Sequence, residues 1–221
     1  MKQKIKKYLL KLTYPMHAVC MGCADASGHE RGWLCEECRE KLAKSWVGAS
    51  LATGECHAEG AAFAYSYTGP AGGLVRNLKY RGARHLGSFM APDMVRALEC
   101  IEPVNADMVV PVPMHPRRKR LREYNHAEVL AEHVAKMKGL EMRCVLKRVR
   151  MTTQQARLSD EERRHNLDQA IVIDEDVAGK CILLVDDVCT TGATAAACEN
   201  VLRQAGAKHV FLLCYALAKV R

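Results

Sequence analysis

The chain has 221 residues, of which 49% are hydrophobic and 26% are charged. This balance is typical of a folded globular protein and excludes an intrinsically disordered chain. Lysine and arginine outnumber aspartate and glutamate by 33 to 25, which gives a formal net charge of +8. The excess favours anionic partners: phosphorylated metabolites, nucleic acid or acidic membrane surfaces. No stretch approaches the roughly 18 continuous apolar residues of a membrane-spanning helix, so we expect no membrane insertion.

The N-terminus carries a cluster of lysines that resembles the charged start of a secretion signal. These are Lys2, Lys4, Lys6 and Lys7. The apolar part that follows covers only residues 8–10, and Lys11 interrupts it. We therefore predict no secretion signal and a cytoplasmic protein, in which cysteines stay reduced. Residues 8–12 are expected to form a short basic helix.

Four of the eleven cysteines form two closely spaced pairs. They are Cys20 and Cys23, then, after eleven residues, Cys35 and Cys38. Two Cys-x2-Cys knuckles at this spacing predict a tetrahedral Zn²⁺ site, which is structural because four thiolates leave no open position. The alternative is a set of unrelated buried thiols or a redox pair.

We divide the chain into a head at residues 1–57 and a larger domain at residues 58–221. The head is short and rich in cysteine, and it needs the metal because it has too few apolar residues for a core of its own. In the larger domain, strand patterns lie at residues 61–67, 107–112, 170–173, 181–185 and 209–215, and helical patterns at 74–80, 86–101, 125–137 and 194–204. This alternation predicts an α/β fold with a parallel sheet covered by helices on both faces.

The run after the strand at 181–185 has the order expected of a phosphate site. It reads Asp186, Asp187, Val188, Cys189, Thr190, Thr191, Gly192, Ala193 and Thr194. Ligands of open parallel sheets bind beyond the carboxyl ends of the strands, and the N-terminus of the following helix favours an anion. The two carboxylates can accept hydrogen bonds from ribose hydroxyls, and Gly192 allows close approach of the backbone. The alternative is that the diacid caps a helix and Thr-Thr-Gly is an ordinary turn.

This run resembles the signature with which type I phosphoribosyltransferases bind 5-phosphoribosyl-1-pyrophosphate (PRPP). Further blocks narrow the resemblance to the ComF/GntX-like family, which is linked to DNA uptake in natural transformation. These blocks are Tyr65-x-Tyr67 with residues 78–82, residues 109–115 with Arg117, Arg120 and residues 122–126, and Leu146-x-Arg148 with Thr152, Gln154, Gln155 and residues 163–167. Two places depart from the family pattern: Cys189, where an aliphatic residue is usual, and Glu123-Tyr124-Asn125-His126, where Gly-Phe-Asn-Gln is more common.

The resemblance implies two further PRPP contacts. Lys79 and Tyr80 match a pyrophosphate-binding loop, although a lysine beside Gly82 also fits an ordinary helix C-terminus. The second contact is a flexible loop that closes over PRPP, and its matching residues are Arg117, Arg120 and Arg122. The same dense basic run also fits a nucleic-acid patch, and one segment can serve both purposes.

Three functions are consistent with these residues. The first is a PRPP-binding protein of DNA uptake that handles incoming single-stranded DNA in the cytoplasm, with a DNA-uptake helicase as a possible partner. The second is an active phosphoribosyltransferase of nucleotide metabolism, with Mg²⁺ on PRPP, Asp186 and Asp187 as catalytic residues and an unidentified acceptor. The third is a plain regulator of purine or pyrimidine metabolism, and no helix-turn-helix pattern supports it.

Overall fold

A computed structural model of the chain describes residues 19–25, 32–49, 58–101, 104–149 and 170–218. The expected N-terminal helix at 8–12 and residues 152–167 of the third family block lie outside these residues. The helices are α2 (Glu36–Lys44), α3 (Gly69–Tyr80), α4 (Leu86–Leu98), α5 (Pro116–Arg122), α6 (His126–Lys138) and α8 (Ala193–Gln204). The strands are β1 (Trp46–Ala49), β2 (Gly60–Ser66), β3 (Met108–Pro111), β4 (Glu141–Met142), β5 (Leu146–Arg148), β6 (Ile171–Ile173), β7 (Cys181–Cys189) and β8 (His209–Leu217).

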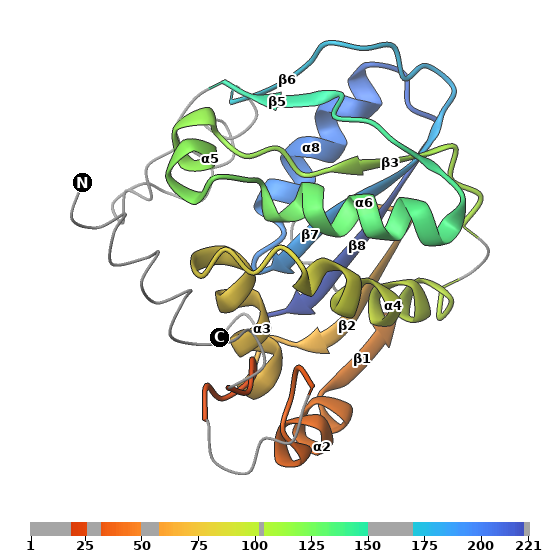
Figure 1. The fold of residues 1–221 in the computed structure, drawn as a ribbon. Helices are drawn as coiled ribbons and strands as arrows, with labels where there is room; N and C mark the ends of the chain where they lie inside the picture. The colour runs from red at the N-terminus through yellow and green to blue at the C-terminus, as the bar shows by residue number, and fades with distance from the viewer. Residues whose placement is uncertain (1–18, 26–31, 50–57, 102–103, 150–169, 219–221) are drawn as a thin grey trace.

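A six-stranded sheet organises the molecule, with the order β1-β2-β8-β7-β3-β4 (Figure 1). Every neighbouring pair from β2 to β4 is parallel, and only the edge strand β1 is antiparallel. The centre of β7 is the unbroken apolar run Ile182–Val185, as expected of a strand buried on both faces. A separate antiparallel pair, β5 and β6, lies beside α8.

Helices cover both faces of the sheet, which confirms the predicted α/β class. Leu183 and Val185 of β7 pack in one core with α3, α4 and α6, while Ile182 and Leu184 pack in a second core with α8. Alternate residues of one strand thus serve opposite faces. Figure 1 shows α4 and α6 in front of the sheet and α8 behind it.

Local signals position the helices that border the site. Helix α3 begins at Gly69 with Pro70 in its first turn, a position at which proline costs no hydrogen bond. The Asn125 side chain accepts a hydrogen bond from the Ala127 N–H and caps α6, which ends at Gly139 with φ +66°. These signals fix where the residues before α6 and after α3 lie relative to the sheet.

The Cys-rich segment contributes to the same sheet as the larger domain. Strand β1 follows α2 directly and pairs with β2, with Gly48 opposite Phe63. Cys20, Leu34 and Leu42 of the segment belong to the core that also contains α3 and α4. The division at residue 57 remains a prediction. No helix in the described parts of the chain is both long and apolar enough to cross a membrane.

Candidate PRPP site and metal centre

The diacid lies at the carboxyl end of the central strand. Sequence patterns ended this strand at Val185, whereas β7 continues through Asp186 and Asp187 to Cys189 because it stays paired with β8. Asp187 is buried and Asp186 is half-buried, and the Asp187 N–H donates to Asp186 Oδ1 at 2.8 Å. Two carboxylates are therefore held side by side at the edge where parallel sheets bind ligands.

Lys79, the first predicted pyrophosphate contact, lies against this diacid. Its Nζ lies 2.8 Å from Asp187 Oδ1, and both side chains are largely buried. Burial alone would lower the pKa of Lys79, but the charge and hydrogen bond of Asp187 outweigh it and raise that pKa. More than 100 residues of sequence separate the two groups, so this ion pair joins two segments that were predicted independently.

His126 links the ion pair to the basic helix α5. It is buried, and its Nδ1 lies 3.7 Å from Asp187 Oδ2. Burial lowers the pKa of His126 to about 4, in spite of the opposing effect of Asp187, so the imidazole is neutral at pH 7. Its Nε2 lies 3.3 Å from Arg122 Nη1. In the sequence, His126 stands out only as a departure from the motif of the resembling family, and no local pattern there indicates this role.

Arg122 and Tyr80 complete this network. Arg122 Nη2 donates to the Tyr80 hydroxyl at 3.3 Å, and the guanidinium carbon lies 5.0 Å from the centre of the Tyr80 ring. Four predicted site residues therefore meet around His126, namely Lys79, Tyr80, Arg122 and Asp187. Arg117 and Arg120 are exposed on α5 instead.

The segment predicted as a flexible loop is a short helix in the structure. Pro116 stands in its first turn, and the His115 side chain accepts a hydrogen bond from the Arg117 N–H at 3.1 Å. Both features start helices, and none of its residues is buried. That this segment moves over a ligand remains a prediction.

Asp186 has a different electrostatic environment from its neighbour. Burial and the charge of Asp187 raise the pKa of Asp186 to about 7, while Lys79 and Arg148 act in the opposite direction. Arg148 lies on β5 and acts on Asp186 through its charge, and burial lowers the pKa of Arg148 itself. A carboxyl that changes its charge near neutral pH is typical of binding and catalytic sites. Arg148 had appeared only as part of a family block.

The hydroxyl-rich loop leads from β7 into α8 as predicted. Gly192 adopts φ +87° at the N-cap of α8, a conformation that glycine takes without strain. Thr191 Oγ1 accepts a hydrogen bond from the Ala193 N–H at 3.3 Å, and Thr194 stands in the first turn. The N-terminus of this twelve-residue helix thus follows the diacid closely, where its dipole favours a phosphate.

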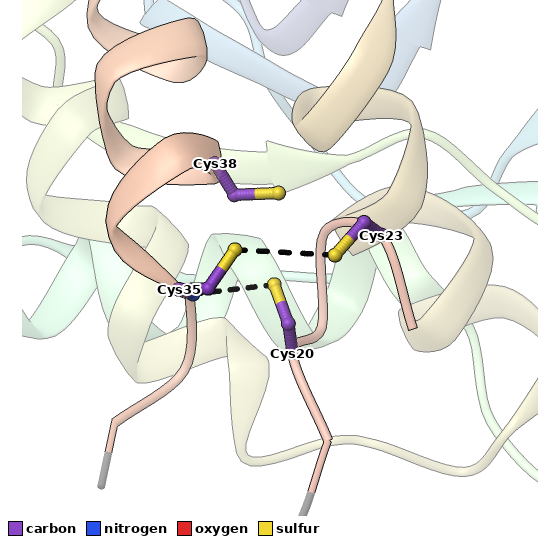
Figure 2. Close-up of side chains that lie close together, drawn as sticks. All are labelled: Cys20, Cys23, Cys35 and Cys38. Atoms are coloured by element: carbon purple, nitrogen blue, oxygen red, sulfur yellow. Dashed lines mark hydrogen bonds between the residues drawn. The ribbon is translucent and has the colours of Figure 1, made fainter. Parts of the chain in front are cut away.

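The four predicted metal ligands converge. Figure 2 shows the Cys20, Cys23, Cys35 and Cys38 side chains pointing toward one another from a tight turn and from the start of α2. All four Sγ atoms lie within 4.8 Å of one another, and Cys23 Sγ and Cys35 Sγ are 3.9 Å apart. Zinc–sulfur bonds of about 2.3 Å in a tetrahedron need separations of this size.

The donors around Cys20 also suit a thiolate ligand. The N–H groups of Gly22 and Cys35 each donate to Cys20 Sγ at 3.3 Å. Burial by itself raises the pKa of Cys20, but backbone hydrogen bonds from Cys23, Cys35 and Gly22 outweigh it and lower that pKa to about 6. The cluster therefore fits a thiophilic metal, and Zn²⁺ bound there would staple the turn at Cys20 to α2.

The cysteine turn packs on α3 with very little space between them. A Cβ atom added to Gly73 would lie 1.9 Å from the carbonyl oxygen of Gly22. The buried Asn77 side chain donates to the Met21 carbonyl at 2.8 Å. The metal centre is thus held directly against the helix that ends in Lys79 and Tyr80.

Comparison with known proteins identifies the family. No family model matches the chain. DNA utilization protein YhgH of Salmonella typhimurium is 29% identical over 206 residues, which cover 89% of this chain and 88% of the relative. YhgH of Salmonella typhi is 31% identical over 153 residues, 67% of each chain. The chain belongs to the YhgH and competence protein F family. Competence protein F of Haemophilus influenzae itself is 32% identical over 108 residues, 47% of each chain.

Solved structures show a more distant likeness. A glutamine PRPP amidotransferase from B. subtilis is 20% identical, with a TM-score of 0.41 over 62% of this chain and 30% of that one. Because this TM-score is below 0.5, the likeness has no bearing on function.

Two residues at the site were singled out by the sequence as departures from the pattern of the resembling family. His126 contacts both Asp187 and Arg122. Cys189 is buried, where a free cysteine packs as a small apolar side chain. A hydrogen bond from Cys214 lowers the pKa of Cys189, against the effect of burial.

Proposed function

We propose that this chain binds PRPP with Mg²⁺ at the carboxyl end of β7. Asp186 and Asp187 would accept hydrogen bonds from the ribose hydroxyls, and their oxygens suit a hard cation such as Mg²⁺. The loop from Val188 to Thr194 would surround the phosphate. The ion pair between Lys79 and Asp187 is the observation that carries the proposal, because it joins the two predicted contact segments.

In this proposal, the side chains of Lys79 and Arg122 leave their partners in the protein and contact the ligand when it binds. In the structure both cations are engaged by groups of the protein itself, Lys79 by Asp187 and Arg122 by His126 and Tyr80. An incoming pyrophosphate offers both of them a more highly charged partner. The short helix α5 would follow Arg122, so that Arg117 and Arg120 close over the bound anion.

We further propose that the protein acts in DNA uptake and handles incoming single-stranded DNA in the cytoplasm. Its family includes proteins named for DNA utilization and for competence, and its net charge of +8 suits a nucleic-acid partner. The metal centre would hold structural Zn²⁺. A helicase of DNA uptake is the protein partner that the family resemblance suggests.

A catalytically active phosphoribosyltransferase is the second candidate. The observation that favours it is the pKa of Asp186, raised to about 7 by burial and by Asp187. A carboxyl with such a pKa can take up or release a proton at neutral pH, as the departure of pyrophosphate and the attack of an acceptor would require. Turnover would be detected as pyrophosphate release that depends on an added acceptor.

Calorimetric titration with PRPP and Mg²⁺ tests the main proposal. We expect saturable binding to the intact chain, loss of that binding in Asp187→Asn, and no change in Glu132→Gln, an exposed control on α6. Affinity should rise between pH 6 and 8 as Asp186 ionises, and Asp186→Asn should remove that pH dependence. The proposal is wrong if the folded protein fails to bind PRPP, or if Asp187→Asn binds it as the control does.

A further inference from the structure

A pocket of about 260 Å³ lies between the metal centre and α3. One wall is the cysteine turn at residues 22–24. The other wall is formed by α3 and the residue after it, and it consists of Gly73, Arg76, Asn77, Tyr80 and Arg81. We call this space the knuckle pocket.

Helical spacing separates the knuckle pocket from the PRPP site. Gly73, Asn77 and Tyr80 follow one another at three or four residues and share one face of α3. Lys79 points from a different face to Asp187. Only Tyr80 belongs to both sites, because Arg122 contacts its ring and hydroxyl while the same residue lines the pocket.

The side chains of the knuckle pocket suit a nucleotide. Arg76 and Arg81 are exposed, and in the described residues neither has an ion pair. Among the described residues, no carboxylate lines the pocket. The Tyr80 side chain is 64% exposed, which is unusual for so large an aromatic group. Two guanidinium groups beside an exposed ring can bind a phosphate and stack a base.

We propose that the knuckle pocket binds one nucleotide unit of single-stranded DNA, with its phosphate on Arg76 and Arg81 and its base against Tyr80. The inference rests on the proposed role in DNA handling and names the site of contact. A metal held by four thiolates keeps a net negative charge at the cysteine wall, so the phosphate lies on the α3 side. A stacked base suits a single strand, because bases within a duplex are not free to stack on protein.

The pocket exists only while the metal centre is docked on α3. The contact of Gly73 with Gly22 and the hydrogen bond from Asn77 to Met21 hold its two walls together. Zinc therefore shapes the DNA contact without touching the ligand. Because Tyr80 also contacts Arg122, we expect a strand bound in the pocket to alter the PRPP affinity, and PRPP to alter the DNA affinity by the same factor.

Fluorescence anisotropy with a labelled oligothymidine and the zinc-loaded full chain tests the inference. Tyr80→Ala should weaken binding about 5- to 150-fold, the range of base stacking on an aromatic side chain, and Tyr80→Trp should restore it. Arg76→Ala/Arg81→Ala should weaken binding and make the salt dependence shallower by about 0.7 in log–log slope, the value for one phosphate contact of a single strand. Lys136→Ala/Lys138→Ala removes two exposed charges from α6 and serves as the matched control.

The outcomes separate this inference from the function on which it rests. If the wild-type chain does not bind the oligonucleotide, the proposed DNA role fails. If the wild type binds and the arginine pair variant matches the α6 control, the DNA role stands and the knuckle pocket is refuted. Zinc content and thermal unfolding of each variant confirm that it is folded, so weaker binding can be assigned to the pocket.

Discussion

The contact between Gly73 and Gly22 makes the docking of the metal centre testable with one methyl group. Gly73 lies inside α3, and an added Cβ would stand 1.9 Å from the Gly22 carbonyl oxygen. Ordinary van der Waals contact begins at 3.4 Å, so Gly73→Ala must move the cysteine turn by about 1.5 Å. Backbone on both sides leaves no flexible side chain to give way.

The expected cost follows from three contributions. Overpacking costs about 1–3 kcal/mol. Loss of the buried hydrogen bond from Asn77 to Met21 costs about 1 kcal/mol. Alanine stabilises a helix interior by about 1 kcal/mol relative to glycine. Gly73→Ala should therefore lower the free energy of unfolding by roughly 1–3 kcal/mol.

Gly72→Ala is the matched control, because Gly72 stands next to Gly73 in the same helix. Its Cβ would approach the end of the Arg76 side chain at 3.0 Å, a flexible group that can move, and would otherwise make an ordinary contact of 4.0 Å with the Tyr67 ring. We expect a gain of up to about 1 kcal/mol. Thermal unfolding should then separate the two variants by roughly 2–16 °C, and only Gly73→Ala should release zinc faster to a chelating dye. Equal melting temperatures and equal zinc release would refute the docked arrangement.

Three further outcomes follow from the geometry. Cys38→Ser should abolish binding of one zinc per chain, measured by atomic absorption, whereas Cys100→Ser, an exposed thiol outside the cluster, should retain it. Burial lowers the pKa of the His126 imidazole to about 4, so protonation favours the unfolded chain. The wild type should therefore lose about 3 kcal/mol of stability between pH 6.5 and 4, and His126→Gln should not show this loss. The reasoning is wrong if urea unfolding gives the two proteins the same dependence of stability on pH across that window. Tyr215→Phe should leave stability unchanged or raise it, since the described residues offer its buried hydroxyl no hydrogen bond. Tyr65→Phe should lower stability by about 1 kcal/mol, because it removes the hydrogen bond to Asp93. Equal effects of the two substitutions in calorimetric unfolding would contradict this expectation.

The features that could be predicted from the sequence are those set by neighbours along the chain. The apolar run of β7, the diacid and the loop to Gly192 form one continuous segment, so their order alone indicates a strand, a site and a helix. The spacing of the two Cys-x2-Cys pairs likewise predicts that their four thiols converge on one site. Both features can be predicted without any knowledge of the rest of the fold.

Features that depend on tertiary packing could not be predicted in this way. Strand β1 has only four residues and is defined by its pairing with β2, not by its own pattern. The basic run at 116–122 suggested a loop, since prolines precede it, but Pro116 starts a helix instead. His126 offered no signal of its own. Its role comes from Asp187, which approaches from a strand 61 residues further along the chain.

The ion pair of Lys79 and Asp187 explains how one helix could serve both proposed sites. A buried pair is costly to break from one side, because the remaining charge is left without a partner. The last turn of α3 is therefore fixed at Lys79 by the sheet, while Gly73 and Asn77 fix its earlier turns to the metal centre. A ligand that takes Lys79 from Asp187 loosens one of these two attachments and leaves the other intact. Any movement that PRPP causes in α3 would thus begin at its C-terminal end, where Tyr80 lines the knuckle pocket.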